Sequence, residues 1–337
     1  MSKYWEQRAT QRELEATLIT EKYLARMDIA LKEAQHDILR QIDAFYGRYA
    51  KDNKLTLTEA KKTLTANEFK AFKEIDLKRF REMSLSGNPM YEPLLNAISY
   101  RVRISRLEAL NANIQMTMLQ LYGSDNGLQA YAYTGLSEVY KKTYYHTMFD
   151  LAAFGAAGTV QYLSDTTMRE MLSYNWSGKE FSTRIWGHQK QTIDDVKKSL
   201  ERSFAAGHSL DHTSKAIMEK TSVVRSRVEA LVRTESNFFH NLAAQNSYAD
   251  ADLEKYEVLA TLDMKTSDIC REKDGMIFLT KDYKPGKTAP PFHVRCRTTT
   301  IPWFDESEYT AFEQRQSMNG LVDSMNYEQW SAKFVRK

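Results

Sequence analysis

Residues 256–303 read YEVLATLDMKTSDICREKDGMIFLTKDYKPGKTAPPFHVRCRTTTIPW. Three short runs in this stretch, 256–262, 276–279 and 298–301, are rich in the β-branched and aromatic residues that are typical of strands. The second and third runs are separated by a segment that we expect to be a loop, since it contains Pro285, Gly286, Pro290 and Pro291. The stretch therefore predicts a small sheet, packed on the helices that precede it.

The first 250 residues have a different pattern, with no period-two alternation long enough to indicate a strand. Apolar residues recur every three or four positions between Glu13 and Tyr49, which predicts one long amphipathic helix. The stripe consists of Leu24, Met27, Leu31, Ala34, Ile38, Ile42, Phe45 and Tyr49. Such a stripe can pack inside its own domain or against another chain.

Further helices are expected along the same region. Two capping boxes, Thr56–Glu59 and Thr65–Glu68, predict helix starts, and the breakers Ser86–Pro89 predict a helix end. Helices are also expected over about 91–121, 131–154 and 223–248. Helix-turn-helix units are expected over 168–218, with Gly178, Gly187 and Gly207 between them and Ser209 as an N-cap.

These elements predict a mainly α fold, with a long-helix N-terminal region followed by a small α+β C-terminal domain. We expect four parts: an N-terminal helical region (1–122), a central helical region (123–220), an α+β domain (221–305) and a C-terminal tail (306–337).

Composition excludes several classes of protein. The 337 residues contain no apolar run of 18 or more, so no membrane-spanning helix is expected. The N-terminus is charged and lacks an apolar core, so we expect no secretory signal and synthesis in the cytoplasm. Two cysteines are too few for a disulfide framework. A net charge of +3 neither requires nor excludes a nucleic-acid partner.

Both cysteines, Cys270 and Cys296, lie close in sequence to His293, Asp263 and Asp268. Thiolates and imidazole are good zinc ligands, and a His-x-x-Cys pair can bring two ligands of one loop to a metal. Asp263 or Asp268 would complete a tetrahedron. A disulfide between the cysteines remains an alternative, as do two buried thiols with His293 hydrogen-bonded to an aspartate.

The same residues allow catalysis in principle, either as a Cys–His–Asp trio or through a zinc-activated water. The sequence contains no glycine-rich nucleotide loop, no His-Glu-x-x-His motif and no nucleophile elbow. Tyrosines and lysines are interleaved in Tyr140–Tyr145. Such a segment can stack on single-stranded nucleic acid or form a half-buried helix face, and we favour the helix face.

The motif residues carry a family resemblance. They are Arg233-Thr234-Glu235, then Asp263, Ser267, Asp268, Cys270, Arg271 and Gly275, and then Pro290, Pro291, His293, Cys296 and Arg297. This pattern resembles the minor head protein family of tailed bacteriophages, also called the head-morphogenesis or Mu F-like family. The Pro-Pro-x-His-x-x-Cys-Arg block is its most specific part. Weaker agreement at Trp176–Ile185 extends the resemblance to roughly the second half of the chain.

The resemblance implies a low-copy structural protein of the virion head, associated with the portal vertex and not an enzyme. It implies roles in head assembly and in DNA packaging or ejection, with the host cytoplasm as the place of assembly. The implied partners are the portal protein and other head proteins, and viral DNA weakly. The alternative from a different class is a zinc-dependent hydrolase or nuclease-like effector carried on a phage-type domain.

Two groups of arginines in the motif need partners. We expect Arg233 to pair with a carboxylate of the C-terminal sheet and to join helix and sheet, with a binding role as the alternative. Arg271 and Arg297 make the Cys/His region locally basic, together with Arg295. The region also contains Asp268, Glu272 and Asp274, so a solvated face of mixed charge is expected.

Overall fold

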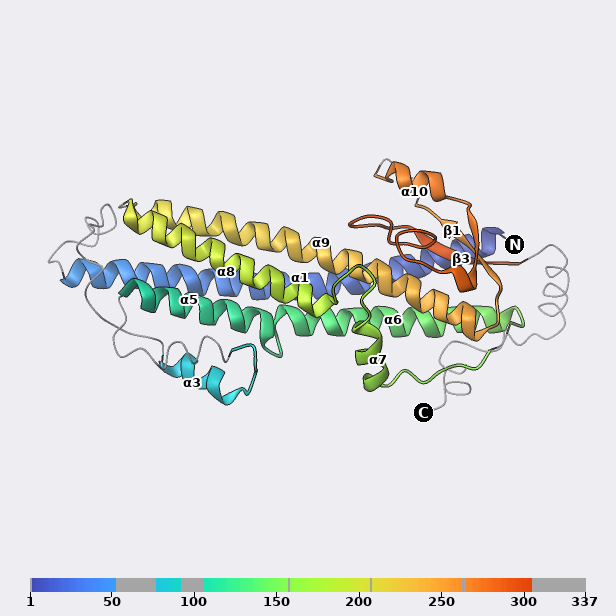
Figure 1. The fold of residues 1–337 in the computed structure, drawn as a ribbon, viewed down its shortest axis with the longest axis horizontal. Coiled ribbons are helices and arrows are strands. Elements are labelled where there is room, and N and C mark those ends of the chain that lie inside the picture. The colour runs from blue at the N-terminus through green and yellow to red at the C-terminus, as the bar shows by residue number, and fades with distance from the viewer. Residues whose placement is uncertain are drawn as a thin grey trace. The chain divides into compact units, whose positions relative to one another are not determined.

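The computed structural model describes residues 2–52, 77–91, 106–156, 158–206, 208–261, 263 and 265–304. Within them, long helices precede a small antiparallel sheet, so the expected fold class is confirmed (Figure 1). The two capping boxes, residues 92–105 of the helix expected over 91–121, and the tail 306–337 lie outside the described residues. No helix among the described residues is long and apolar enough to cross a membrane.

Contacts divide the chain into two compact units, and each unit is assembled from separate stretches of sequence. The first unit comprises Met1–Tyr23, Ala132–Phe181 and Glu229–Lys337, and the second comprises Leu24–Tyr131 and Ser182–Val228. Two long helices, α1 and α9, contribute residues to both units. The four contiguous parts expected from the sequence stay a prediction, because a contact-defined unit need not be contiguous in sequence.

Helix α1 is a single helix, Ser2–Asp52, which confirms the long helix expected from the apolar stripe. It begins before Glu13 because buried residues continue at helical spacing toward the N-terminus, including Trp5, Ala9, Ala16 and Ile19. In the second unit the stripe packs inside its own chain. Met27, Ile38, Ile42 and Phe45 are buried there, whereas Leu31 is half-buried.

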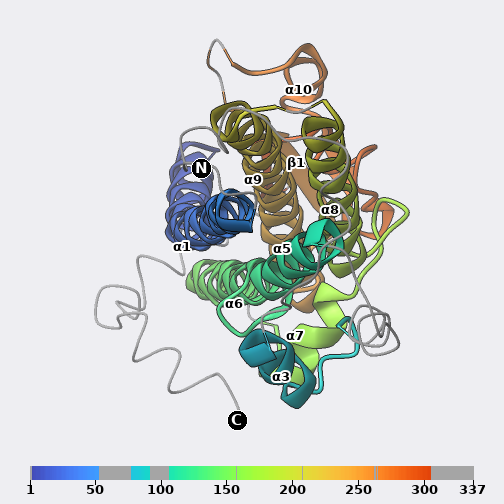
Figure 2. The same ribbon diagram turned by 90° about the vertical axis from the view of Figure 1, so that its left-hand side faces the viewer.

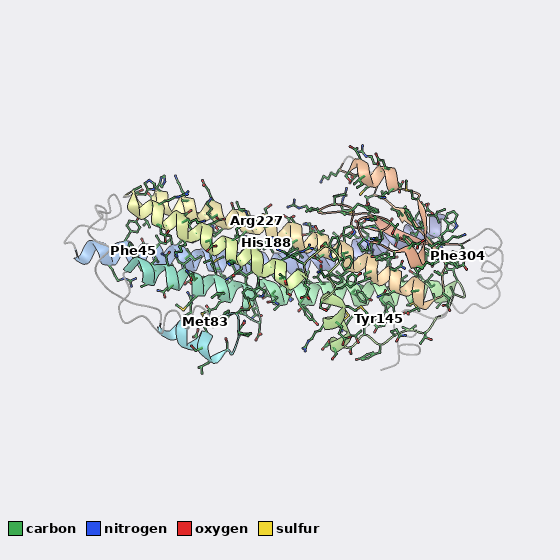
Figure 3. The ribbon with its side chains drawn as sticks, viewed as in Figure 1. Phe45, Met83, Tyr145, His188, Arg227 and Phe304 are labelled. Atoms are coloured by element: carbon green, nitrogen blue, oxygen red, sulfur yellow. The ribbon has the colours of Figure 1, made fainter. Side chains whose placement is uncertain are left out.

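The second unit also contains α3 (Leu77–Leu85), α5 (Arg106–Gly123), most of α8 (Phe181–Ala205) and the start of α9 (Leu210–Asp250). Figure 2 looks nearly along α1, α5, α8 and α9. Side-chain contacts join neighbouring helices: Gln41 of α1 donates to Thr117 of α5, and Gln35 of α1 donates to Thr221 of α9. Met83 and Phe45, labelled in Figure 3, are both buried. Helix α3 ends before Ser86, as predicted.

Two of the expected breaks between helices are wrong. Gly187 was expected to separate helices but lies inside α8, because Ile185, Gln189, Thr192 and Val196 bury one continuous face around it. The cost of one helical glycine, about 1 kcal/mol, is smaller than the gain from burying that face. The helix expected to begin at residue 223 is a continuation of α9, since no breaker interrupts it. Ser209 does cap α9 as predicted, and its Oγ accepts from the His212 N–H.

In the first unit, α6 (Leu128–Ala153), α7 (Asp165–Leu172) and the second part of α9 accompany the sheet. The strands are β1 (Lys255–Leu259), β2 (Ile277–Leu279) and β3 (Thr299–Trp303), with α10 (Asp268–Lys273) between β1 and β2. A short 3-10 turn, η2 (Thr280–Asp282), follows β2. The order is β2-β1-β3, antiparallel throughout, so all three expected strands are confirmed with small shifts in their ends.

The sheet is fastened to helices of the first unit by buried polar and aromatic contacts. Asn237 of α9 donates to the Thr298 carbonyl at 2.9 Å, and the Tyr248 hydroxyl donates to the Thr300 carbonyl at 3.1 Å. Phe304, labelled in Figure 3, stacks on Trp5 of α1 with ring centroids 5.9 Å apart. These contacts fix the position of the loops that extend from the sheet.

Candidate functional site

Cys270, His293 and Cys296 come together in the first unit. The Cys270 Sγ lies 3.2 Å from the His293 Nε2 and 3.8 Å from the Cys296 Sγ, and the three possible ligand atoms all lie within 4.8 Å of one another. Both cysteines are buried free thiols, and His293 is half-buried. The two thiols are not joined as a disulfide in this structure.

Local backbone structure presents the three side chains. Cys270 lies at the third position of α10, where its N–H donates to the Ser267 carbonyl at 3.0 Å. His293 and Cys296 lie in one turn, closed by a hydrogen bond from the Cys296 N–H to the His293 carbonyl at 3.2 Å. Arg295, between them, has a φ of 59°, in the left-handed region that non-glycine residues rarely adopt. This reversal of the chain lets both side chains of the turn face Cys270.

The tautomer of His293 follows from its second nitrogen. Nδ1 lies 2.8 Å from the Val294 carbonyl, which can only accept, so Nδ1 carries the proton. Nε2 is therefore an acceptor, and it faces the Cys270 Sγ. It can accept a hydrogen bond from the thiol or donate its lone pair to a metal.

Thr234 of the Arg-Thr-Glu motif holds this turn. Its Oγ accepts from the Arg295 N–H at 2.9 Å and donates to the Ala230 carbonyl, one helical turn earlier, at 2.6 Å. The hydroxyl thus joins α9 to the loop that carries His293 and Cys296.

Arg233 has different partners from those expected. It pairs with Glu21 of α1 at 2.7 Å and with Glu229 of α9 at 2.8 Å, so the prediction of a sheet carboxylate as its partner is wrong. The physical reason is that Arg233 and Glu229 are four residues apart in one helix, where side chains meet without any help from the sheet. Glu235, the third motif residue, is buried and accepts from the Trp176 Nε1 at 3.0 Å.

The two aspartates expected near the metal do not join the cluster. Asp263 forms a two-pronged ion pair with Arg297, at 2.7 and 2.6 Å, and the hydrogen bonds from Arg297 hold the pKa of Asp263 well below its usual range. The Asp268 side chain is 94% exposed and lies 3.5 Å from Arg271. Arg271 and Arg297 are thus paired with these two aspartates, which gives the expected face of mixed charge.

A cavity of about 590 Å³ adjoins the cluster, and His293 and Cys296 form part of its wall. Its lining also includes Glu13 and Thr17 of α1 and Asn237 of α9. Burial raises the pKa of the Glu13 carboxyl. Sequence reasoning missed Glu13, Thr17 and Asn237, because no motif indicates that the start of α1 lies against a loop some 280 residues later.

The electrostatics do not favour Cys296 as a nucleophile. Burial raises the pKa of the Cys296 thiol, whereas a nucleophile must be a thiolate. Asp263, which could have oriented the histidine, is bound to Arg297 instead. The arrangement suits thiol hydrogen bonding or metal binding better than a Cys–His–Asp trio.

The Tyr140–Tyr145 segment is the half-buried helix face that was favoured from the sequence. Tyr140 and Tyr144 are each 1% exposed, and the Tyr144 hydroxyl donates to Asp250 at 2.5 Å. Lys141 pairs with Asp165 at 3.2 Å. Two of its rings are therefore unavailable for stacking on a nucleic acid.

The comparisons with known proteins concern the same region. Residues 194–301 match the model of a family described as Phage Mu protein F like protein. The motif residues from Arg233 to Arg297 fall inside the match, whereas Trp176–Ile185 falls outside it. A search of curated proteins and a search of solved structures found no match. Residues 194–301 are thus similar to the Phage Mu protein F like family, and the resemblance read from the motif is confirmed over this segment.

Proposed function

We propose that this protein is a minor structural protein of a tailed-phage head, associated with the portal vertex, that acts in head assembly and in DNA packaging or ejection. The observation that supports the proposal is the family match over residues 194–301, which indicates a phage head protein. The role at the portal vertex and the steps in packaging or ejection go further than the match. On this proposal the protein binds other components and does no chemistry.

The structure is compatible with a rigid binding component. The sheet is fixed to α9 through Asn237 and to α1 through the ring stack of Phe304 and Trp5. Two leucines one helical turn apart on α1, Leu14 and Leu18, are 56% and 60% exposed. They would give a head protein an apolar contact surface, since protein interfaces bury apolar side chains at their centre.

The proposed partners are the portal protein and other head proteins, met in the host cytoplasm during assembly and retained in the virion. DNA is proposed to bind weakly at most. The chain has 47 lysines and arginines against 44 aspartates and glutamates, so few cations remain for phosphates. Binding through a few phosphate contacts falls steeply with salt, whereas a largely apolar protein interface does not.

The test is a parallel salt titration of the purified full chain with portal assemblies and with double-stranded DNA. Sedimentation with portal should persist at salt concentrations that abolish DNA binding. Leu18→Glu should weaken portal binding without changing the melting temperature, and Ile29→Glu, at an isoleucine of the same helix that is 57% exposed, is the matched control. Tight, salt-resistant DNA binding without portal association would contradict the proposal.

The alternative, a zinc-dependent hydrolase or nuclease-like effector, is an outcome of a second test. The full chain, supplied with zinc, is incubated with single- and double-stranded DNA and with RNA. Cleavage that disappears in a folded Cys296→Ser variant would favour the effector over the structural role.

A further inference from the structure

The spacing of the cluster atoms matches the dimensions of a metal site. With Zn–S bonds of about 2.3 Å, two thiolates on a tetrahedron lie about 3.8 Å apart. The two sulfur atoms lie at 3.8 Å. A sulfur and an imidazole nitrogen on the same tetrahedron would lie about 3.6 Å apart, and the Cys270 Sγ lies 3.2 Å from the His293 Nε2. Small side-chain rotations are enough to bring all three atoms to one ion.

The surroundings also match a metal site. The proton on Nδ1 of His293 is held by the Val294 carbonyl, which orients Nε2 as a ligand in the way that zinc-bound histidines are usually oriented. Ala260 and Phe292 pack against the two cysteines and exclude water from one side. Two buried cysteine sulfurs beside an unprotonated imidazole nitrogen are a set of ligand atoms for a soft or borderline cation.

Three ligands leave one position of a tetrahedron, and the described residues do not fill it. No further histidine, cysteine, aspartate or glutamate of the described part of the chain brings a ligand atom into the cluster. Of the two aspartates expected as a fourth ligand, Asp263 is held by Arg297 and Asp268 is 94% exposed. The cavity of about 590 Å³ meets the cluster at His293 and Cys296, so the fourth position can be reached from the cavity.

Two residues of the cavity wall carry a buried oxygen atom without a hydrogen-bond partner among the described residues. Asn237 is 8% exposed, lines the cavity, and its Oδ1 has no hydrogen-bond partner among the described residues. The Oγ of Ser267, on the wall near Cys270, is buried and likewise has no partner within the described residues. Buried polar atoms are nearly always hydrogen-bonded, so each of these oxygens needs a partner that the described residues do not supply, such as a water or a ligand admitted from the cavity.

The charges on the walls suit an anionic occupant. Glu13 is the single carboxylate that lines the cavity among the described residues. Four cationic side chains line it as well: Arg233, Lys265, Arg295 and Arg297. Arg233, Arg295 and Arg297 already form ion pairs with carboxylates, so the preference is for one small anion and not for a polyanion.

We propose that Cys270, His293 and Cys296 form a three-ligand zinc site. Its fourth coordination position faces this cavity and takes water or a small anion as the fourth ligand. The bound ligand would receive hydrogen bonds from Ser267 or, as water, donate to Asn237. The site is independent of the proposed head function, since it rests on these side chains alone.

Thr234 is a positioning residue of this site. It touches no ligand atom, but it holds the Arg295 N–H and so the turn that presents His293 and Cys296. Loss of an outer contact of this kind typically weakens metal binding about 10- to 100-fold. Thr234→Val should weaken zinc binding in this way. Ser222→Ala should not, because the Ser222 Oγ donates to the Glu219 carbonyl of its own helix and does not contact the cluster.

The first experiment measures metal content and affinity of the full chain, purified under reducing conditions. Wild type should bind about one equivalent of zinc, as a single site requires. Cys270→Ser and Cys296→Ser should lose it, and Asp268→Asn, at an exposed aspartate, should keep it. If the cysteine variants fail to fold, wild type alone gives the answer, because a chelator should remove the metal and lower the melting temperature.

The second experiment tests the open position. Co²⁺ replaces zinc, and the thiolate-to-cobalt absorption is followed while azide, and separately acetate, is added. The spectrum should shift with saturation for at least one anion, and Lys265→Glu should weaken that binding. A cobalt spectrum that neither anion changes would mean a closed site and would overturn the proposal. Wild-type protein without bound metal, or with a Cys270–Cys296 disulfide after reducing purification, would overturn it as well.

Discussion

At the scale of single residues, His240 shows how burial controls a titration. It is 3% exposed and lies between two threonine hydroxyls, 2.9 Å from Thr143 of α6 and 3.1 Å from Thr299 of β3. Burial lowers the pKa of His240 to about 4, and the nearby charge of Arg12 acts in the same direction. The neutral ring therefore joins α9 to α6 and to the sheet.

This lowered pKa predicts a pH dependence of stability. The His240 ring takes up a proton near pH 6.5 in the unfolded chain and only near pH 4 in the folded chain. The contribution of the neutral ring to the free energy of unfolding is therefore fully present above about pH 6.5. That contribution is lost as the pH falls toward about 4. Between pH 7 and pH 5 the free energy of unfolding should fall by about 2 kcal/mol from this residue.

The measurement is urea unfolding of wild type and His240→Gln at pH 7 and pH 5. Glutamine can hydrogen-bond but does not titrate, so the variant should show a smaller loss of stability on acidification. His36→Gln, at an exposed position, should keep the wild-type loss. Equal losses in wild type and His240→Gln would show that the ring does not stay neutral in the folded chain.

At the scale of elements, the long helices depend on continuous buried faces more than on local signals. Helix α1 extends over 51 residues because a buried residue recurs at nearly every turn. The same reason carries α8 through Gly187 and α9 past residue 223. Packing of a continuous face outweighs a weak breaker of about 1 kcal/mol.

Two isoleucines on α1 allow a matched test of that face. Ile38 is fully buried, whereas Ile29 is 57% exposed. Ile38→Ala should lower the free energy of unfolding by about 2–5 kcal/mol, since it removes buried methyl groups and leaves a cavity. Ile29→Ala should change it by less than about 0.5 kcal/mol. Chemical denaturation of the two variants measures both values, and equal values would mean that the stripe is not the buried face.

At the scale of the whole molecule, the segment that matches the family is not a self-sufficient core. Residues 194–301 contain α9, β1, β2 and the first part of β3, but partners of the sheet lie outside them. The Trp5 ring of α1 stacks on Phe304, and its centroid lies 4.9 Å from the centroid of the Phe154 ring. Thr143 of α6 contacts His240. The first unit therefore takes α1 and α6 from stretches far away in sequence.

A fragment spanning residues 194–304 is accordingly expected not to fold on its own. It would expose the apolar surfaces that Trp5, Phe154 and helix α6 cover in the full chain. Circular dichroism during heating should show no cooperative transition for the fragment and a clear one for the full chain. A cooperative transition of the fragment at the temperature of the full chain would refute the dependence on α1 and α6.

The sequence by itself determined the classes of element: apolar spacing predicted the long helix around Ile38, and β-branched runs predicted the three strands. It also singled out Cys270, His293 and Cys296, because their chemistry is local to a short stretch. Only the tertiary structure decided that Asp263 pairs with Arg297, that Arg233 pairs with Glu21, and that a cavity with walls from α1 adjoins the cluster. Helix and strand formation follow from neighbours in sequence, whereas ion pairs and cavities depend on which distant segments the packing of the core brings together.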